Sequence, residues 1–520
     1  MKKGFTLIEL LSVIIILGVI FIFIFPKLSS LINRGKEVNI EIIKNKLVES
    51  AMEYTEKYNP RLSNKLIDEG DNYVVSGKRL VDSGLIEQDD IDSIENFSRV
   101  KCTLDENEKV NCEIMYKPVK ECTYEGELVQ GAEFIDGQYT YHYKQYFDGS
   151  SWGNISSNAW GITLTDKTST DPVTTKPCTK INGKPISDTR SAFMNSKATS
   201  IDLSGFDTSK VNNMSYMFYN SEATSLDLSN FDTSNVTNMA WMFYDSKATK
   251  INLGDFNTSK VSWIQSIFNN SKVKKLDVST FNTSKAENMS YMFQNSSATE
   301  IILPEKWSTG KNADLTAMFT STKVKELDLS GFDTSKAINM SSMFYNSSVS
   351  MIKGIGNLNT SNVTNMSSMF KDANVIELDL SKYDTSKVTN MTEMFSFCKK
   401  LKRLNVSNFN TTSVTSMNRT NGATYGGMFQ ECDSLTELDI TSFDTSKITS
   451  MHHMFRGCDN LKAIYVSNKF VTDQVTIHDA MFTDSKKLVG GNGTTYSSSH
   501  VDKEYARVDA SGTPGYFTAK

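Results

Sequence analysis

Cysteine, proline and histidine are scarce in this chain, and each shortage excludes a class of protein. Only 7 cysteines and 8 prolines occur in 520 residues, too few for a disulfide-dense scaffold or a proline-rich stalk. The 5 histidines and the lack of Cys-x-x-Cys pairs give no support for a structural zinc site. The formal net charge is −5, and phosphate binding needs a basic surface. We therefore expect no metal, no cofactor and no nucleic acid partner.

Charged residues are nearly absent from the first 25 residues. After Met1-Lys2-Lys3-Gly4 an apolar run extends from Phe5 to Phe25, and Glu9 is its only ionisable residue. At about 1.5 Å per residue, a helix of this length crosses the hydrocarbon core of a bilayer. The sequence predicts a membrane span over residues 5–25, with the lysines inside and the rest of the chain outside. The alternative is a plain signal-anchor helix with a stray glutamate.

This arrangement resembles the N-terminal segment of type IV pilins and pseudopilins. The resemblance implies that a prepilin peptidase cleaves after Gly4 and methylates Phe5. It also implies that Glu9 neutralises the terminal amine of a neighbouring pilin or pseudopilin subunit during assembly. Helical spacing of apolar residues continues to Tyr58, so we expect a leader over 1–4 and one transmembrane and stalk helix over 5–58.

Residues 59–165 are predicted to form a small pilin-like head rich in β-strands. Within it, residues 99–104 and 110–116 alternate apolar and polar side chains around a charged turn, which indicates a hairpin. Cys102 and Cys112 lie on its opposite strands, so a disulfide between them fits an extracellular setting. The connectivity of these two cysteines with Cys122 and Cys178 stays open. Residues 166–180, rich in Thr, Ser and Pro, predict a linker.

A repeat of 25 to 27 residues, with one 34-residue gap, occupies residues 181–489. Each unit carries Leu-Asp-Leu-Ser-x-Phe, then Asp-Thr-Ser, then a turn that ends in Met-Phe. One unit cannot bury its apolar side alone, so neighbouring units must stack. The closing phenylalanine recurs at 193, 218, 243, 268, 293, 319, 344, 370, 395, 429, 455 and 482.

These units resemble the BspA-type leucine-rich repeats of bacterial surface proteins. The resemblance implies a leucine-rich-repeat solenoid of about eleven turns with one short parallel strand per turn. Residues 490–520 resemble the closing segment that follows such repeats, and we expect them to form a C-terminal cap. The expected fold class is α+β: a long N-terminal pilin-like helix, a small β-rich head and the solenoid.

An outward column of aspartates on the strand face provides the candidate binding residues. Calcium-binding repeats of the Gly-Gly-x-Gly-x-Asp type are absent, so the alternative to ligand binding is a merely solvated face. The head and the inserted loop over 418–427 are the other candidate binding regions. Asp207 and its copies begin each turn and are expected to cap backbone groups. The candidate binding residues are Asp202, Asp227, Asp277, Asp328, Asp379 and Asp439.

Catalysis has no signature in this sequence. Cys398, Cys432 and Cys458 occupy a slot that holds serine in other units, which indicates a structural role. Three histidines, at 452, 453 and 478, lie nearby in sequence, but no motif places one of them as the base of a nucleophile. We therefore predict that the chain is not an enzyme.

Two functions remain. The first is a cell-surface, pilin-like adhesin whose solenoid binds an extracellular protein or glycan on host or neighbouring cells, as the BspA resemblance implies. The alternative is a pseudopilin subunit of a type II secretion-like or DNA-uptake machine. Both predict a single-pass protein of the inner (cytoplasmic) membrane with extracellular C-terminal domains, incorporated into a surface pilus.

Overall fold

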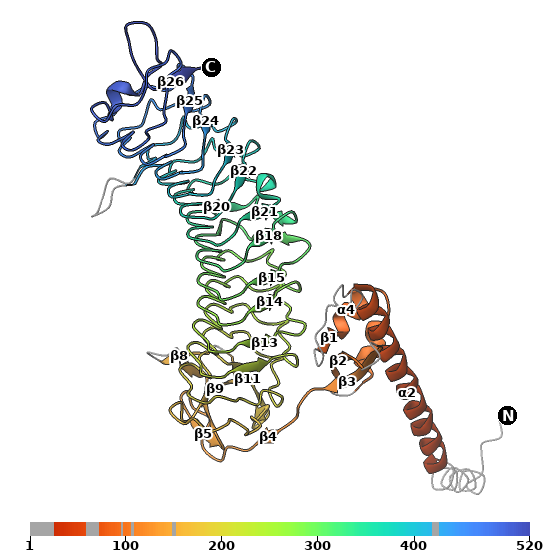
Figure 1. Ribbon diagram of the computed structural model, residues 1–520. Coiled ribbons are helices and arrows are strands. Elements are labelled where there is room, and N and C mark those ends of the chain that lie inside the picture. The colour runs from red at the N-terminus through yellow and green to blue at the C-terminus, as the bar shows by residue number, and fades with distance from the viewer. Residues whose placement is uncertain are drawn as a thin grey trace, which may run out of the picture. The chain divides into compact units, whose positions relative to one another are not determined.

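The computed structural model (Figure 1) describes residues 25–58, 72–94, 97–105, 109–147, 152–155, 157–418 and 426–520. The chain divides into two compact units, Met1–Pro118 and Val119–Lys520. Each unit has its own hydrophobic core, and among the described residues no buried residue belongs to both cores. The predicted processing and assembly residues Gly4, Phe5 and Glu9 lie outside the described residues.

In the first unit, a helix packs on a small antiparallel sheet with the strand order β1-β2-β3. Leu47 and Ala51 of the helix are buried in one core with Val100 of the sheet. Cys102 and Cys112 face each other across β2 and β3 and form a disulfide. The elements are α2 (Phe25–Tyr58), β1 (Asn72–Ser76), α4 (Gly77–Asp82), α5 (Gln88–Asp92), β2 (Phe97–Leu104) and β3 (Val110–Tyr116).

The structure corrects the helical part of the predicted fold class. The described chain is mostly β-solenoid, and α2 is not the long apolar helix expected over residues 5–58. From Arg34 onward the sequence of α2 carries charged residues such as Glu41 and Lys44. In the described part of the chain, no helix is long and apolar enough to cross a membrane. The predicted pilin-like helix and the predicted single-pass membrane location are therefore wrong for the described chain, and residues 5–24 lie outside it.

The second unit begins with a six-stranded sheet, in the order β4-β10-β11-β9-β6-β5, at the first turn of the solenoid (Figure 1). Tyr139 of this sheet packs edge-on against Phe193 and Phe206 of the solenoid. The six strands are β4 (Glu121–Cys122), β5 (Glu133–Asp136), β6 (Tyr139–Tyr143), β9 (Trp160–Leu164), β10 (Lys180–Ile181) and β11 (Lys184–Asp188). Strands β7 (Gln145–Phe147) and β8 (Trp152–Asn154) pair with each other as a separate antiparallel hairpin.

Two predicted domain boundaries change because of this packing. The predicted head over 59–165 contains the division between the two units at Pro118 and Val119. Residues 166–180 do not form a linker, since Val173 and Cys178 are buried in the core of the solenoid. Cys178 also forms a disulfide with Cys122.

The solenoid is built on a ladder of stacked phenylalanines. Eleven successive ring pairs, from Phe193–Phe218 to Phe455–Phe482, lie 5.3 to 6.0 Å apart, so the ladder joins twelve turns rather than about eleven. Short strands of successive turns pair in parallel, for example β12 with β13 and β22 with β23. The strands are β12 (Ser225–Asp227), β13 (Lys250–Asn252), β14 (Lys275–Asp277), β15 (Glu300–Ile302), β16 (Trp307–Ser308), β17 (Ala313–Asp314), β18 (Glu326–Asp328), β19 (Phe332–Asp333), β20 (Ala337–Asn339), β21 (Met351–Lys353), β22 (Glu377–Asp379), β23 (Arg403–Asn405), β24 (Glu437–Asp439) and β25 (Ala463–Val466), with a 3-10 turn η2 (Ile355–Asn357).

The Asp-Thr-Ser segment explains why the repeat stacks so regularly. In one turn, Asp232 accepts a hydrogen bond from the backbone N–H of Ser234, which closes a local turn. The buried hydroxyl of Thr233 donates to the carbonyl of Asn257 in the next turn and accepts from the N–H of that residue. Backbone polar groups in the turn are thus satisfied between units, as buried backbone requires.

The C-terminal residues cover the last turn of the solenoid. Strand β26 (Phe517–Ala519) pairs in parallel with β25, and the 3-10 turn η3 (Lys503–Tyr505) precedes it. The rings of Tyr516 and Phe517 pack edge-on against Phe482, the last ring of the ladder. The exposed end of the apolar ladder is thereby closed.

Candidate functional site

The predicted binding aspartates stabilise the turns that follow the strands. Each of the six carboxylates accepts a hydrogen bond from the backbone N–H two residues later, at 2.9 to 3.1 Å. For example, Asp227 accepts from Ser229 and Asp328 accepts from Ser330. Such Asx turns hold the corner after each strand. The residues with this bond are Asp202, Asp227, Asp277, Asp328, Asp379 and Asp439.

Lysines and an asparagine from other segments also form ion pairs or hydrogen bonds with the carboxylates of this column. Lys353 donates to Asp328 at 2.8 Å, and this bond, with those from Ser330, lowers the pKa of the carboxyl to about 2. Lys176 pairs with Asp202 in the same way, and Asn252 donates to Asp227 at 3.0 Å. The carboxylates of Asp202, Asp227 and Asp328 therefore already accept hydrogen bonds from other residues of this unit.

A second surface, which sequence reasoning missed, carries partly exposed aromatic rings. We call it the aromatic face. It is formed by the residues two before and one after the ladder phenylalanine in the early turns. Tyr219 stacks on Tyr244, with 4.8 Å between ring centroids. The residues of the aromatic face are Tyr216, Tyr219, Trp241, Tyr244 and Tyr291.

The aromatic face is interrupted at the turn that contains Phe268, and a depression of about 440 Å³ lies there. Ser266 and Asn269 occupy the slots that hold Trp241 and Tyr244 in the preceding turn. The Nδ2 atom of Asn269 donates to Oε1 of Gln294 at 2.9 Å. The first depression is lined by Trp241, Tyr244, Gln265, Ser266, Asn269, Asn288, Ser290, Tyr291 and Gln294.

A second depression of about 320 Å³ adjoins the first, because Asn288 lines both. Its aromatic wall is Trp263, whose side chain is 48% exposed. Its remaining lining residues are Glu287, Lys311, Asn312 and Asp314. The two depressions together offer a site longer than either one.

The turn over residues 250–274 departs from the repeat where these depressions lie. At the slot of Trp263, the neighbouring turns hold Asn238 and Asn288, whose side chains accept from the N–H two residues later. Tryptophan has no such acceptor, so this turn lacks a bond that its neighbours have. The sequence signal was available: Trp-Ile-Gln-Ser-Ile-Phe-Asn stands at 263–269 where the consensus is Asn-Met-Ser-Tyr-Met-Phe-Tyr.

The three solenoid cysteines have the geometry of buried structural groups. The thiol of Cys398 donates to the carbonyl of Phe370, and that of Cys458 donates to the carbonyl of Phe429. Burial raises the pKa of Cys458 to about 12 and also raises the pKa of Cys398 and Cys432. A thiol with a raised pKa is a poor nucleophile at neutral pH.

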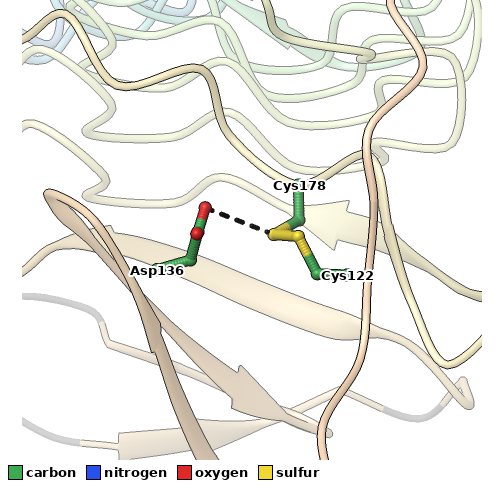
Figure 2. A group of neighbouring side chains, drawn as sticks. All are labelled: Cys122, Asp136 and Cys178. Carbon is green, nitrogen blue, oxygen red and sulfur yellow. Dashed lines mark hydrogen bonds between the residues drawn. A yellow bond between two sulfur atoms is a disulfide. The ribbon is translucent and has the colours of Figure 1, made fainter.

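Within the described ranges, two groups of side chains bring potential metal ligands within 4.8 Å of one another. Figure 2 shows the first, in which Cys122 and Cys178 are joined as a disulfide and Asp136 lies 3.5 Å from Cys178 Sγ. A disulfide offers no thiolate to a metal, and Lys120 already donates to Asp136 at 2.5 Å. The second group is His478, Asp479 and Asp502, where Asp502 accepts from the N–H of Ala480.

Comparison with known proteins identifies the repeat. Four overlapping segments, residues 187–307, 275–351, 313–424 and 423–505, match a family described as Mycoplasma protein of unknown function, DUF285. The match covers the repeat part assigned from the BspA resemblance and does not extend to the N-terminal residues. No curated protein and no solved structure matches the chain. Since the matched segments span residues 187–505, more than half of the sequence, the chain belongs to the DUF285 family.

Proposed function

We propose that this chain is an adhesive surface protein, whose solenoid binds a macromolecule on host or neighbouring cells. The observation that carries the proposal is the pair of adjoining depressions beside the aromatic face. Aromatic residues and clefts of this size are typical of ligand-binding surfaces. Trp263, whose side chain is 48% exposed, adds an aromatic ring to the second depression.

Two further features support an adhesive surface protein: its disulfides and its repetitive surface. The disulfides Cys102–Cys112 and Cys122–Cys178 persist only in an oxidising compartment. The stacked turns provide a long, repetitive surface of the kind that repeat proteins use to bind extended partners. Binding is favoured over catalysis, because the solenoid cysteines are buried with raised pKa values.

Adhesion by the purified full chain tests the proposal. Beads coated with the folded chain should bind host cells, neighbouring cells or their extracellular matrix in a saturable way, and free chain should compete. Beads coated with heat-unfolded chain are the matched control. Absence of saturable binding to all three surfaces would count against an adhesive function.

A further inference from the structure

The first depression carries a more specific inference than adhesion alone. We propose that it is a saccharide-binding site that takes neutral sugar units of a glycan or polysaccharide. This inference rests on the proposed function, since it names the chemical class of the partner.

The walls of the site are aromatic. Trp241 and Tyr291 line it from the turns before and after, and Tyr291 is 39% exposed. The face of an aromatic ring carries partial negative charge, which attracts the C–H groups on the flat side of a sugar ring. Peptides also contact aromatic rings, so the preference for a saccharide over a peptide must come from the polar groups at the floor of the site.

The floor of the site is an amide without its full set of hydrogen bonds. Gln265 is only 7% exposed, and its Oε1 atom has no hydrogen-bond partner among the described residues. An unsatisfied buried acceptor costs about 1–3 kcal/mol. The Oε1 atom is enclosed in the free chain, so a ligand hydroxyl recovers this free energy when the Gln265 side chain turns towards the depression that it lines. Rotation of the amide about its last torsion exchanges its oxygen and nitrogen, so it offers either an acceptor or a donor. Sugar hydroxyls both donate and accept, and they match such a group.

The charge of the site selects neutral sugars. None of the nine residues lining the first depression carries a charge at neutral pH. In the second depression, the acids Glu287 and Asp314 outnumber the single base Lys311. Acidic sugars would therefore meet repulsion at one end of the site and no cation at the other.

The site continues beyond one sugar unit. Asn288 lines both depressions, and Trp263 provides a further exposed ring in the second. Neighbouring turns hold Asn238 and Asn288 at the slot of Trp263, and Ala240 and Ser290 at the slot of Gln265. Both departures from the repeat lie at the depressions, although Trp263 forfeits the turn-capping bond of asparagine. We therefore expect an oligosaccharide to bind more tightly than its monosaccharide.

Binding of defined polysaccharides to the full chain tests the inference. The probes are neutral glucans, mannans and galactans, with hyaluronate as an acidic polymer, followed by affinity electrophoresis and by tryptophan fluorescence. We expect at least one neutral polymer to retard the chain and change its fluorescence, and hyaluronate to do neither. Retardation by none of the neutral polymers, or by hyaluronate alone, would overturn the inference.

Two variants that restore the repeat provide the mutational test. Trp263→Asn and Gln265→Ser introduce residues that other turns carry at these slots, so both variants should fold. We expect each to raise the dissociation constant by about tenfold or more, with the circular dichroism and the melting temperature maintained. Tyr345→Asn is the matched control, since it removes an exposed ring from a later turn. Equal binding by wild type and both variants, or equal weakening by the control, would contradict the inference.

The two proposals fail in different ways. Adhesion that survives both Trp263→Asn and enzymatic removal of cell-surface glycans would overturn the saccharide site and leave adhesion standing. Such adhesion would point to a protein partner. Absence of adhesion by the wild-type chain, with neutral polysaccharide binding retained, would overturn the adhesive function and leave the saccharide site standing.

Discussion

The indole ring of Trp241 stacks on the ring of Tyr216, with 4.9 Å between centroids and 11° between planes. Both residues have positive φ values, 55° and 59°, where bulky side chains are uncommon. Later turns hold Ser342 and Ser368 at the same slot with φ of 55° and 54°. The backbone therefore does not require an aromatic residue there, and the stacked pair belongs to the half-buried rings of the aromatic face.

The phenylalanine ladder predicts that one core substitution is severe. Phe268 is fully buried between Phe243 and Phe293. Its ring centroid lies 5.5 Å from that of Phe243 and 6.0 Å from that of Phe293. Phe268→Ala leaves a cavity between turns and should lower the free energy of unfolding by about 3–5 kcal/mol. Urea denaturation followed by circular dichroism measures this, with Tyr345→Asn as the surface control. A loss no larger than that of the control would show that the ladder does not stabilise the solenoid.

Asp328 is predicted to matter for folding rather than only for binding. Asp328→Ala removes the turn bond to Ser330 and should cost about 1 kcal/mol, whereas Asp328→Asn keeps an acceptor and should cost less. Thermal melts of the two variants decide the point, and equal melting temperatures for alanine, asparagine and wild type would refute it.

The same residue predicts a dependence of stability on acid. The pKa of Asp328 is about 2 in the folded chain and 3.8 when unperturbed, so the folded state favours the ionised form. The resulting stability is present above pH 3.8 and is lost as the pH falls from there towards 2. Lys353→Met removes the paired charge and should reduce the slope of unfolding free energy in this range. An unchanged slope would exclude a contribution from the pair.

The buried thiols predict a loss of stability in alkali. The pKa of Cys458 is about 12 when folded and 9.0 when unperturbed, so the unfolded chain releases its proton first. Stability is therefore complete below pH 9 and falls as the pH rises from there towards 12. Ser485 occupies the equivalent slot and donates to Phe455 at 2.5 Å, so Cys→Ser variants should fold.

Denaturation of the triple Cys398→Ser/Cys432→Ser/Cys458→Ser variant measures the effect. Its urea midpoint should fall less than that of the wild type between about pH 8 and about pH 10. A parallel fall in both proteins would assign the alkaline loss to other groups.

The solenoid is predicted to fold without a metal ion. Its recurrent carboxylates hold backbone N–H groups and lysines, as at Asp328. EDTA should therefore leave the melting temperature unchanged. In the described part of the chain, one candidate cation site remains to be tested, and it consists of His478, Asp479 and Asp502. A fall in melting temperature with EDTA that Asp502→Asn abolishes would place a cation at that set.

The period of the sequence predicted much of the solenoid. The recurrence of the phenylalanine predicted that neighbouring units stack, and Asp232 caps a turn as its position after the strand suggested. Periodicity reports what each unit shares, so it overlooked a site formed where one unit differs. Gln265 and Trp263 interrupt the pattern, and the depressions that they line together with residues of other turns arise only when successive turns stack.

The sequence misled where local pattern conflicts with tertiary packing. Residues 166–180 have the composition of a linker, but Val173 and Cys178 are buried in the core. The aspartate column looked like a free surface because alternation along a strand shows only that the side chains point outward. It does not show that Asp227 bonds to Ser229 at the following corner.

Adhesion of a doubly substituted full chain is the most direct measurement. Trp263→Asn/Tyr291→Ser removes one aromatic wall from each depression and introduces residues that other turns carry at these slots. Saturable adhesion to cells or matrix should be lost, while circular dichroism and the melting temperature match those of the wild type. Adhesion at the wild-type level by the folded double variant would contradict a binding site on this surface.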